Sequence, residues 1–314
     1  MTNDAAALVA DARNGNRTAL ARLLSMVERG GEPARQVGRL THRLGGTATT
    51  IGLTGAPGAG KSTLTNALIT AMRADGLGVA VLAIDPSSPF TGGAILGDRV
   101  RMGEHALDDG VFIRSMATRG HLGGLALATP EAVRVLDATG HERILIETVG
   151  VGQVEVEIAS SADTTVVVVN PGWGDEVQAA KAGLLEIADV FVVNKADRAG
   201  ARDTHRDLEQ MLELSAPAKG WRPPIIDTVA LDGTGIESLW AALGDHQRHL
   251  EASGQLQRRR AERLGRELRD IVAERLHERA VALCSGGDYE RLETAVLERR
   301  LDPWSASDQL LALR

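Results

Sequence analysis

A glycine-rich segment between a short apolar run and a helical one constrains this chain more than any other feature. Residues 55–63 read GAPGAGKST and fit the pattern G-x-x-x-x-G-K-[ST]. The run before them, Thr50–Thr54, has the composition of a strand, and the residues after them have helical spacing. In that context, backbone amides of the loop and the N-terminus of the helix cradle a phosphate group. The segment therefore predicts a nucleotide-binding α/β fold.

The residues of this loop have separate expected roles. The lysine reaches the β and γ phosphates, and the hydroxyl that follows it ligates Mg²⁺. We expect nine residues to contact the nucleotide: Gly55, Ala56, Pro57, Gly58, Ala59, Gly60, Lys61, Ser62 and Thr63. Only four of the 35 Lys and Arg residues are lysines, namely Lys61, Lys181, Lys195 and Lys219. This scarcity favours functional roles for Lys61, Lys181 and Lys195.

Further apolar runs along the chain predict the rest of the sheet. They are Val79–Ile84, Val111–Ile113, Arg143–Glu147, Thr164–Val169, Val190–Val193 and Ile225–Ala230. Several runs are continuous rather than alternating, which is typical of strands that helices cover on both faces. We therefore predict a doubly wound, mostly parallel sheet of the α/β class over residues 48–250.

Both ends of the chain are predicted to be helical extensions, over residues 1–47 and 251–314. The first has apolar residues at helical spacing. In the second, one helical stripe carries Leu264, Leu268, Ile271, Val272, Leu276 and Leu283. Such a stripe needs a partner, which is either the chain's own core or a second subunit. Acidic residues surround the run Arg258–Arg260, so we interpret it as a solvated helix face rather than a nucleic-acid site.

A second motif predicts which base the nucleotide carries. Asn194, Lys195, Ala196 and Asp197 directly follow a predicted strand and form the N-K-x-D element of guanine-binding proteins. The Asp197 carboxylate can accept hydrogen bonds from guanine N1–H and from its N2 amino group, and adenine offers no such pair of donors. We also assign Ala230 and Leu231, after the next strand, to the loop that covers the base.

Three acidic residues are candidates for the magnesium site. Asp85 and Glu147 end predicted strands, and Asp98 lies in a loop near another. Ligands bind at the carboxyl ends of strands in such sheets, and Mg²⁺ combines few carboxylates with phosphate oxygens and water. Which of the three ligate the metal directly stays open. Gly150, shortly after Glu147, is assigned to the γ-phosphate through its amide.

Composition excludes several other classes of protein. A formal net charge of −7 argues against a general nucleic-acid or anionic-membrane binder. Cys284 is the only cysteine, so no intramolecular disulfide can form. The first residues lack the order of a signal peptide, and no apolar run approaches the roughly 20 residues of a membrane span. We therefore expect a soluble, cytoplasmic protein.

Taken together, these motifs resemble the MeaB/MMAA (ArgK-type) GTPases. The resemblance implies a P-loop GTPase of the metal-chaperone branch that forms homodimers through its C-terminal helices. It implies slow, Mg²⁺-dependent hydrolysis of GTP to GDP, with Lys61, Asp98, Glu147 and Lys181 as catalytic residues. Residues 172–186, which include Lys181, match a third switch. By position, Asp85, Asp98 and Glu147 match the family's magnesium-site acids, and they join Ser62 of the phosphate loop in the predicted metal site.

The partner that the resemblance implies is a cobalamin-dependent acyl-CoA mutase. Family members gate adenosylcobalamin delivery to methylmalonyl-CoA mutase and protect or reactivate it. Residues 115–124 differ from a more Pro/Ser-rich stretch in several members, so a related acyl-CoA mutase stays open as the partner. Two alternatives are a nickel-insertion GTPase, which calls for a His-rich tract, and a transport-system kinase, which calls for ATP.

Overall fold

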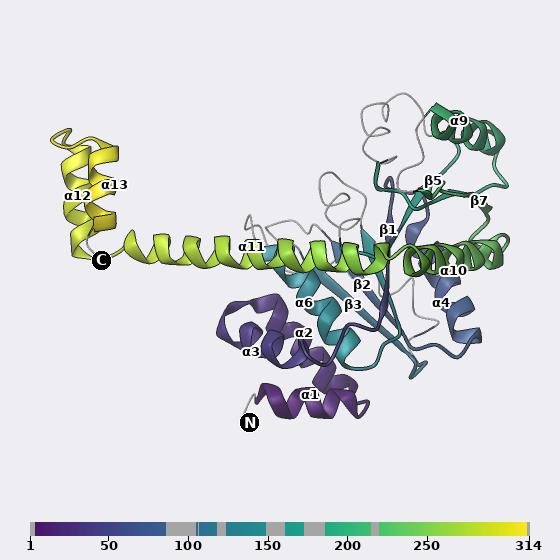
Figure 1. Ribbon diagram of the computed structural model, residues 1–314, viewed down its shortest axis with the longest axis horizontal. Helices are drawn as coiled ribbons and strands as arrows, with labels where there is room; N and C mark the ends of the chain where they lie inside the picture. The colour runs from purple at the N-terminus through teal and green to yellow at the C-terminus, as the bar shows by residue number, and fades with distance from the viewer. Residues whose placement is uncertain are drawn as a thin grey trace. The chain divides into compact units, whose positions relative to one another are not determined.

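The computed structural model describes residues 4–85, 105, 107–117, 124–148, 161–172, 186–214 and 220–312. Its strands form one seven-stranded sheet (Figure 1). The strand order is β3-β2-β4-β1-β5-β6-β7, and every neighbouring pair is parallel. The strands are β1 (Thr49–Thr54), β2 (Val79–Asp85), β3 (Val111–Ala117), β4 (Arg143–Thr148), β5 (Thr164–Val169), β6 (Val190–Asn194) and β7 (Ile225–Thr228). The predicted fold class is confirmed.

Each predicted strand is present, and the differences lie at the ends. β3 continues to Ala117 because its whole length pairs with β2. β7 stops at Thr228 instead of Ala230, because Val229 pairs antiparallel with Thr234 in a turn.

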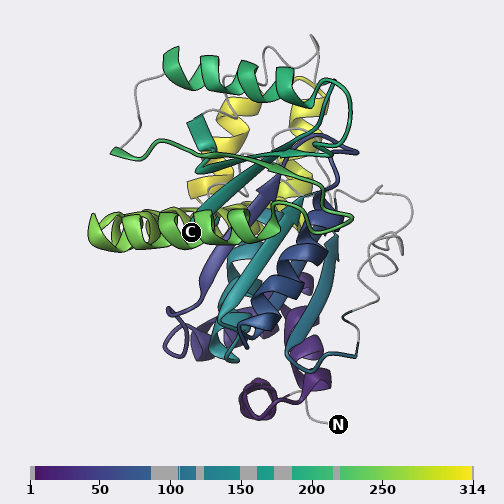
Figure 2. The same cartoon turned by 90° about the vertical axis from the view of Figure 1, so that its right-hand side faces the viewer.

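Helices cover both faces of the sheet, and this explains the continuous apolar runs. Val166 and Val168 of β5 belong to the core with α4 (Lys61–Ala74) and α10 (Ile236–Ala252). Val167 and Val169 face the opposite way, towards α9 (Ala201–Leu214). Figure 2 shows α4 in front of the strands. Because helices shield both faces of the sheet from water, successive residues of a strand are apolar.

Three N-terminal helices pack on the β2–β3–β4 half of the sheet together with α6 (Gly124–Ala138). They are α1 (Ala5–Arg13), α2 (Arg17–Arg29) and α3 (Gly31–Thr41). The Asn16 side chain caps α2 by accepting from the amides of Thr18 and Ala19. The apolar side of α2 is buried at Leu23 and Leu24.

The C-terminal part contains α11 (Gln255–Leu283), α12 (Gly287–Leu297) and α13 (Pro303–Ala312). The chain forms two compact units, residues 1–263 and 264–314. Among the described residues, none of the helices combines the length and the apolarity that crossing a bilayer requires.

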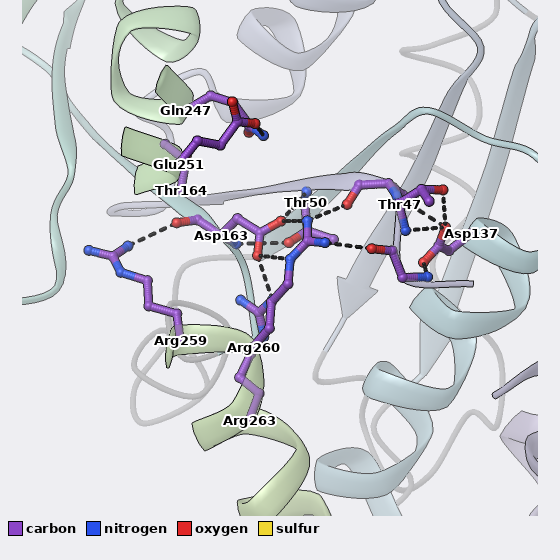
Figure 3. A network of polar contacts seen from close by, with 12 residues as sticks. Thr47, Thr50, Asp137, Asp163, Thr164, Gln247, Glu251, Arg259, Arg260 and Arg263 are labelled. Atoms are coloured by element: carbon purple, nitrogen blue, oxygen red, sulfur yellow. Dashed lines mark hydrogen bonds and ion pairs between the residues drawn. The ribbon is translucent and has the colours of Figure 1, made fainter. Parts of the chain in front are cut away.

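The first turns of α11 correct one interpretation from the sequence. Arg259 and Arg260 are not a solvated face, because they form ion pairs with Asp189 and Asp163 at 2.8 Å. Arg263 also pairs with Asp163. Asp163 is buried where it precedes β5 (Figure 3), and Asp189 is buried where it precedes β6. These arginines therefore fix the start of α11 to the sheet.

Candidate functional site

The candidate site lies at the carboxyl ends of β1 and β4, where residues 55–60 connect β1 to α4. A pocket of about 410 Å³ opens there. It is lined by Pro57, Gly58, Gly60, Lys61, Ser62, Thr63, Ala83, Ile84, Glu147, Thr148 and Lys195. The pocket thus contains residues from both sequence motifs.

Two glycines allow the loop to pass close to neighbouring strands. Gly55 has φ +140°, and a Cβ on it would lie 2.0 Å from the Val168 carbonyl oxygen. Gly60 has φ +93°, and a Cβ there would lie 2.4 Å from Nδ2 of Asn194. Any side chain at either position would displace the loop. The glycines therefore set the path of the backbone around the phosphate site.

Lys61 begins α4 and is only 6% exposed. Its Nζ donates to the carbonyl oxygens of Gly55 at 2.5 Å and Ala56 at 3.0 Å. The ammonium group therefore lies within the loop, beside the amides that we expect to bind phosphate.

Glu147 connects the sheet to the first turns of α4. The Ser62 hydroxyl donates to Glu147 Oε1 at 2.5 Å, and the Thr65 hydroxyl donates to Oε2 at 3.0 Å. Glu147 itself is 6% exposed. The structure thus brings together two predicted magnesium-site residues, Ser62 and Glu147. The sequence motif did not identify Thr65, although its position three residues after Ser62 places both hydroxyls on one helix face.

Asn194 links the base-binding motif to the phosphate loop. Its Nδ2 donates to the Ala59 carbonyl at 2.9 Å. Its Oδ1 accepts from the Thr228 hydroxyl at 3.1 Å and from the Ala230 amide at 3.2 Å. One buried side chain therefore joins the loop, the end of β6 and the residues after β7.

The rest of the base-binding motif is more open to solvent. Lys195 has a φ of +60°, and its Nζ donates to the Gly58 carbonyl at 2.6 Å. Asp197 is exposed, so its carboxylate is accessible to a ligand. After β7, Ala230 is buried and Leu231 is 89% exposed. Because the Ala230 amide bonds to Asn194, both parts of the predicted base site are anchored to one residue.

Several predicted site residues lie outside the described residues. These are Asp98, Gly150, Lys181 and the predicted switch residues 173–185. Asp85 is the last residue of β2, but its side chain is not among those that the structure describes. Their predicted roles stay predictions from the sequence.

With this geometry established, comparison with known proteins identifies the family. A family model described as "Methylmalonyl Co-A mutase-associated GTPase MeaB" matches residues 20–285. The chain belongs to the MeaB family. The match includes the phosphate loop, the N-K-x-D motif and the start of α11.

Individual relatives of this MeaB-family chain agree with that assignment. A putative GTPase of Pyrococcus abyssi is 50% identical over 307 residues, which are 97% of this chain and 95% of the relative. The GTPase ArgK of Escherichia coli is 38% identical over 257 residues, covering 78% and 76% of the two chains. A crystal structure titled "LAO/AO transport system kinase" has a TM-score of 0.73 and 27% identity, covering 99% of this chain and 98% of its own.

The family and the fold establish the coarse activity. The chain is a P-loop GTPase that binds guanine nucleotide. The sequence motifs predict that Lys61 and Ser62 bind the phosphates and that Asn194 and Asp197 bind the base.

Proposed function

We propose that this GTPase acts as a Mg²⁺-dependent chaperone of a cobalamin-dependent acyl-CoA mutase. It gates adenosylcobalamin loading and protects or reactivates the mutase, which we propose to be methylmalonyl-CoA mutase. The observation that carries this proposal is the match of residues 20–285 to a family described as associated with that mutase. The GTPase site supports it, since a nucleotide-driven chaperone needs a site competent for hydrolysis.

The residues present fit a magnesium ion. The Ser62 hydroxyl donates its hydrogen to Glu147, so the lone pairs of the Ser62 oxygen are available to a cation. Both groups supply the oxygen atoms that Mg²⁺ prefers. When bound, the ion would neutralise charge on the β and γ phosphate oxygens. We propose that Ser62 ligates it, that Glu147 orients Ser62, and that Asp85 and Asp98 complete the site.

Hydrolysis then depends mainly on position and charge. Lys61 places a cation at the β and γ phosphates, and the loop amides hold the nucleotide in line with the attacking water. No side chain needs to act as a general base, because P-loop NTPases work largely by orienting the water and stabilising charge. Slow turnover without a partner follows from this chemistry, and the mutase would complete the arrangement.

Steady-state GTP turnover with and without purified methylmalonyl-CoA mutase tests this function. We expect the mutase to accelerate turnover of the wild-type protein. Lys181→Ala should keep the intrinsic rate and lose the acceleration, because Lys181 lies in the predicted third switch. Charge added near a γ-phosphate can increase hydrolysis by roughly 10³- to 10⁵-fold.

Two outcomes would contradict parts of this proposal. No acceleration by the mutase would reject the mutase as the partner. Equal acceleration of the wild-type protein and Lys181→Ala would reject the switch role of Lys181 while keeping the partner. A large drop in the intrinsic rate would instead place Lys181 in the resting active site.

We further propose that the protein is a homodimer through its C-terminal helices. The stripe on α11 is exposed in the single chain, with Leu268 at 62% and Leu276 at 55%. Replacing both with lysine in the full chain should convert a dimeric mass to a monomeric one in light scattering. The control is Leu214→Lys on α9, which is 90% exposed and should keep the wild-type mass. A dimeric double variant would place the interface elsewhere.

A further inference from the structure

Both oxygen atoms of the Glu147 carboxylate accept hydrogen bonds from side chains of the protein. Glu147 lies at register positions opposite Leu53 of β1 and Ala83 of β2, so neighbouring strands flank it on both sides. Only 6% of the residue is exposed. A buried carboxylate needs hydrogen-bond donors for each oxygen, because an unpaired charge in a dry site is costly. Ser62 and Thr65 each donate a hydrogen bond to one of these oxygens.

The two hydroxyls occupy different environments. Ser62 lines the nucleotide pocket, whereas Thr65 is fully buried and does not line it. Thr65 therefore contacts the carboxylate from the protein interior rather than from the pocket. Its hydroxyl lies 3.0 Å from Oε2, while Oε1 is 2.5 Å from Ser62. This forked arrangement fixes the rotation of the Glu147 carboxylate about its terminal bond.

We propose that Thr65 is a positioning residue of the magnesium site. By donating to Oε2, it keeps Oε1 directed at Ser62, and Ser62 then keeps its lone pairs directed into the pocket. This inference rests on the magnesium site proposed above. Groups that hold metal ligands from behind commonly change metal affinity or activity by about 10- to 100-fold when they are removed.

The alternative is that Thr65 only fills space in the core. Valine has nearly the same shape but no hydroxyl, so Thr65→Val separates the hydrogen bond from the packing. Thr65→Ser restores the hydroxyl. Thr65→Cys keeps a similar size with a much weaker donor. The matched control is Thr41→Val, because Thr41 is also fully buried and donates its hydroxyl to the Val37 carbonyl, away from the site.

GTP turnover and GDP affinity are measured for each full-length variant over a range of free Mg²⁺, including chelator alone. For Thr65→Val we expect the half-saturating Mg²⁺ concentration to rise by about 10-fold or more. The affinity for GDP in chelator should stay unchanged, and Mg²⁺ should tighten GDP binding less than in wild type. Thr65→Cys should shift in the same direction, whereas Thr65→Ser and Thr41→Val should behave as wild type.

An unchanged Mg²⁺ requirement in Thr65→Val overturns the proposal, as does an equal shift in Thr41→Val. If Thr65→Val does not fold, Thr65→Cys decides by the same criterion. If turnover and GDP affinity of the wild-type protein do not change with the Mg²⁺ concentration, the magnesium site itself is rejected. If the wild-type protein depends on Mg²⁺ and Thr65→Val has the same half-saturating Mg²⁺ concentration, only the role of Thr65 is rejected.

Discussion

Asp197→Asn should move the base preference of this GTPase from guanine to xanthine nucleotides. In the predicted base site, guanine presents N1–H and an amino group to the Asp197 carboxylate. Xanthine has a carbonyl in place of that amino group, and an amide can donate to it. Sites built around such hydrogen bonds reject a mismatched ligand by up to roughly 10⁴- to 10⁵-fold. We expect a large loss of GTP affinity and a gain for xanthosine triphosphate.

Competition binding of GTP and xanthosine triphosphate measures this exchange directly. The matched control is Asp203→Asn in the first turn of α9, an exposed acid six residues away that should leave the preference unchanged. A variant at Asp197 that still prefers GTP as strongly as wild type would show that another residue reads the base. The anchoring of Asn194 would then serve the loop alone.

Asp163→Asn should lower the free energy of unfolding by about 3 kcal/mol or more, because breaking a buried ion pair costs about 3–5 kcal/mol. Asp163 is completely buried, and it pairs with Arg260 and Arg263. Arg260 also donates to the backbone carbonyls of Gly46 and Ala48, so the cluster connects α11 to the start of β1 (Figure 3). Urea denaturation of the full chain measures the loss.

A surface pair provides the control for this effect. Asp245 forms an exposed pair with Arg248, and such pairs contribute little to stability. Asp245→Asn should therefore leave the urea midpoint almost unchanged. Equal, small changes in both variants would mean that the buried cluster contributes no more than a surface pair.

The dependence of stability on pH should also distinguish the wild-type protein from Asp163→Asn. Burial alone would raise the pKa of the Asp163 carboxyl, but hydrogen bonds and charges from Arg260 and Arg263 outweigh it and lower the pKa. The unfolded chain then binds the proton more readily than the folded one. The stabilisation is complete above the ordinary value of about 3.9 and is lost as pH falls towards the folded pKa. Below about pH 4, wild type should lose stability more steeply than Asp163→Asn.

The site was predictable where its chemistry depends on residues close together in the sequence. The loop 55–63 directly follows β1, the motif Asn194–Asp197 begins at the last residue of β6, and the parallel sheet brings these strand ends to one edge. The role of Thr65 was not predictable in this way. Its partner, Glu147, is 82 residues away, and only the packing of α4 on β4 places the two side chains in contact.

The sequence by itself determined the strands, their burial on both faces, the phosphate loop and the base motif. These properties follow from local composition and from the alternation of side chains along a strand. The tertiary structure alone decided the role of the arginines on α11. A charged helix face has the same pattern whether it contacts water or buried acids, and Asp163 lies 97 residues before Arg260. Only the fold shows that these charges are paired, because pairing depends on distance in space rather than along the chain.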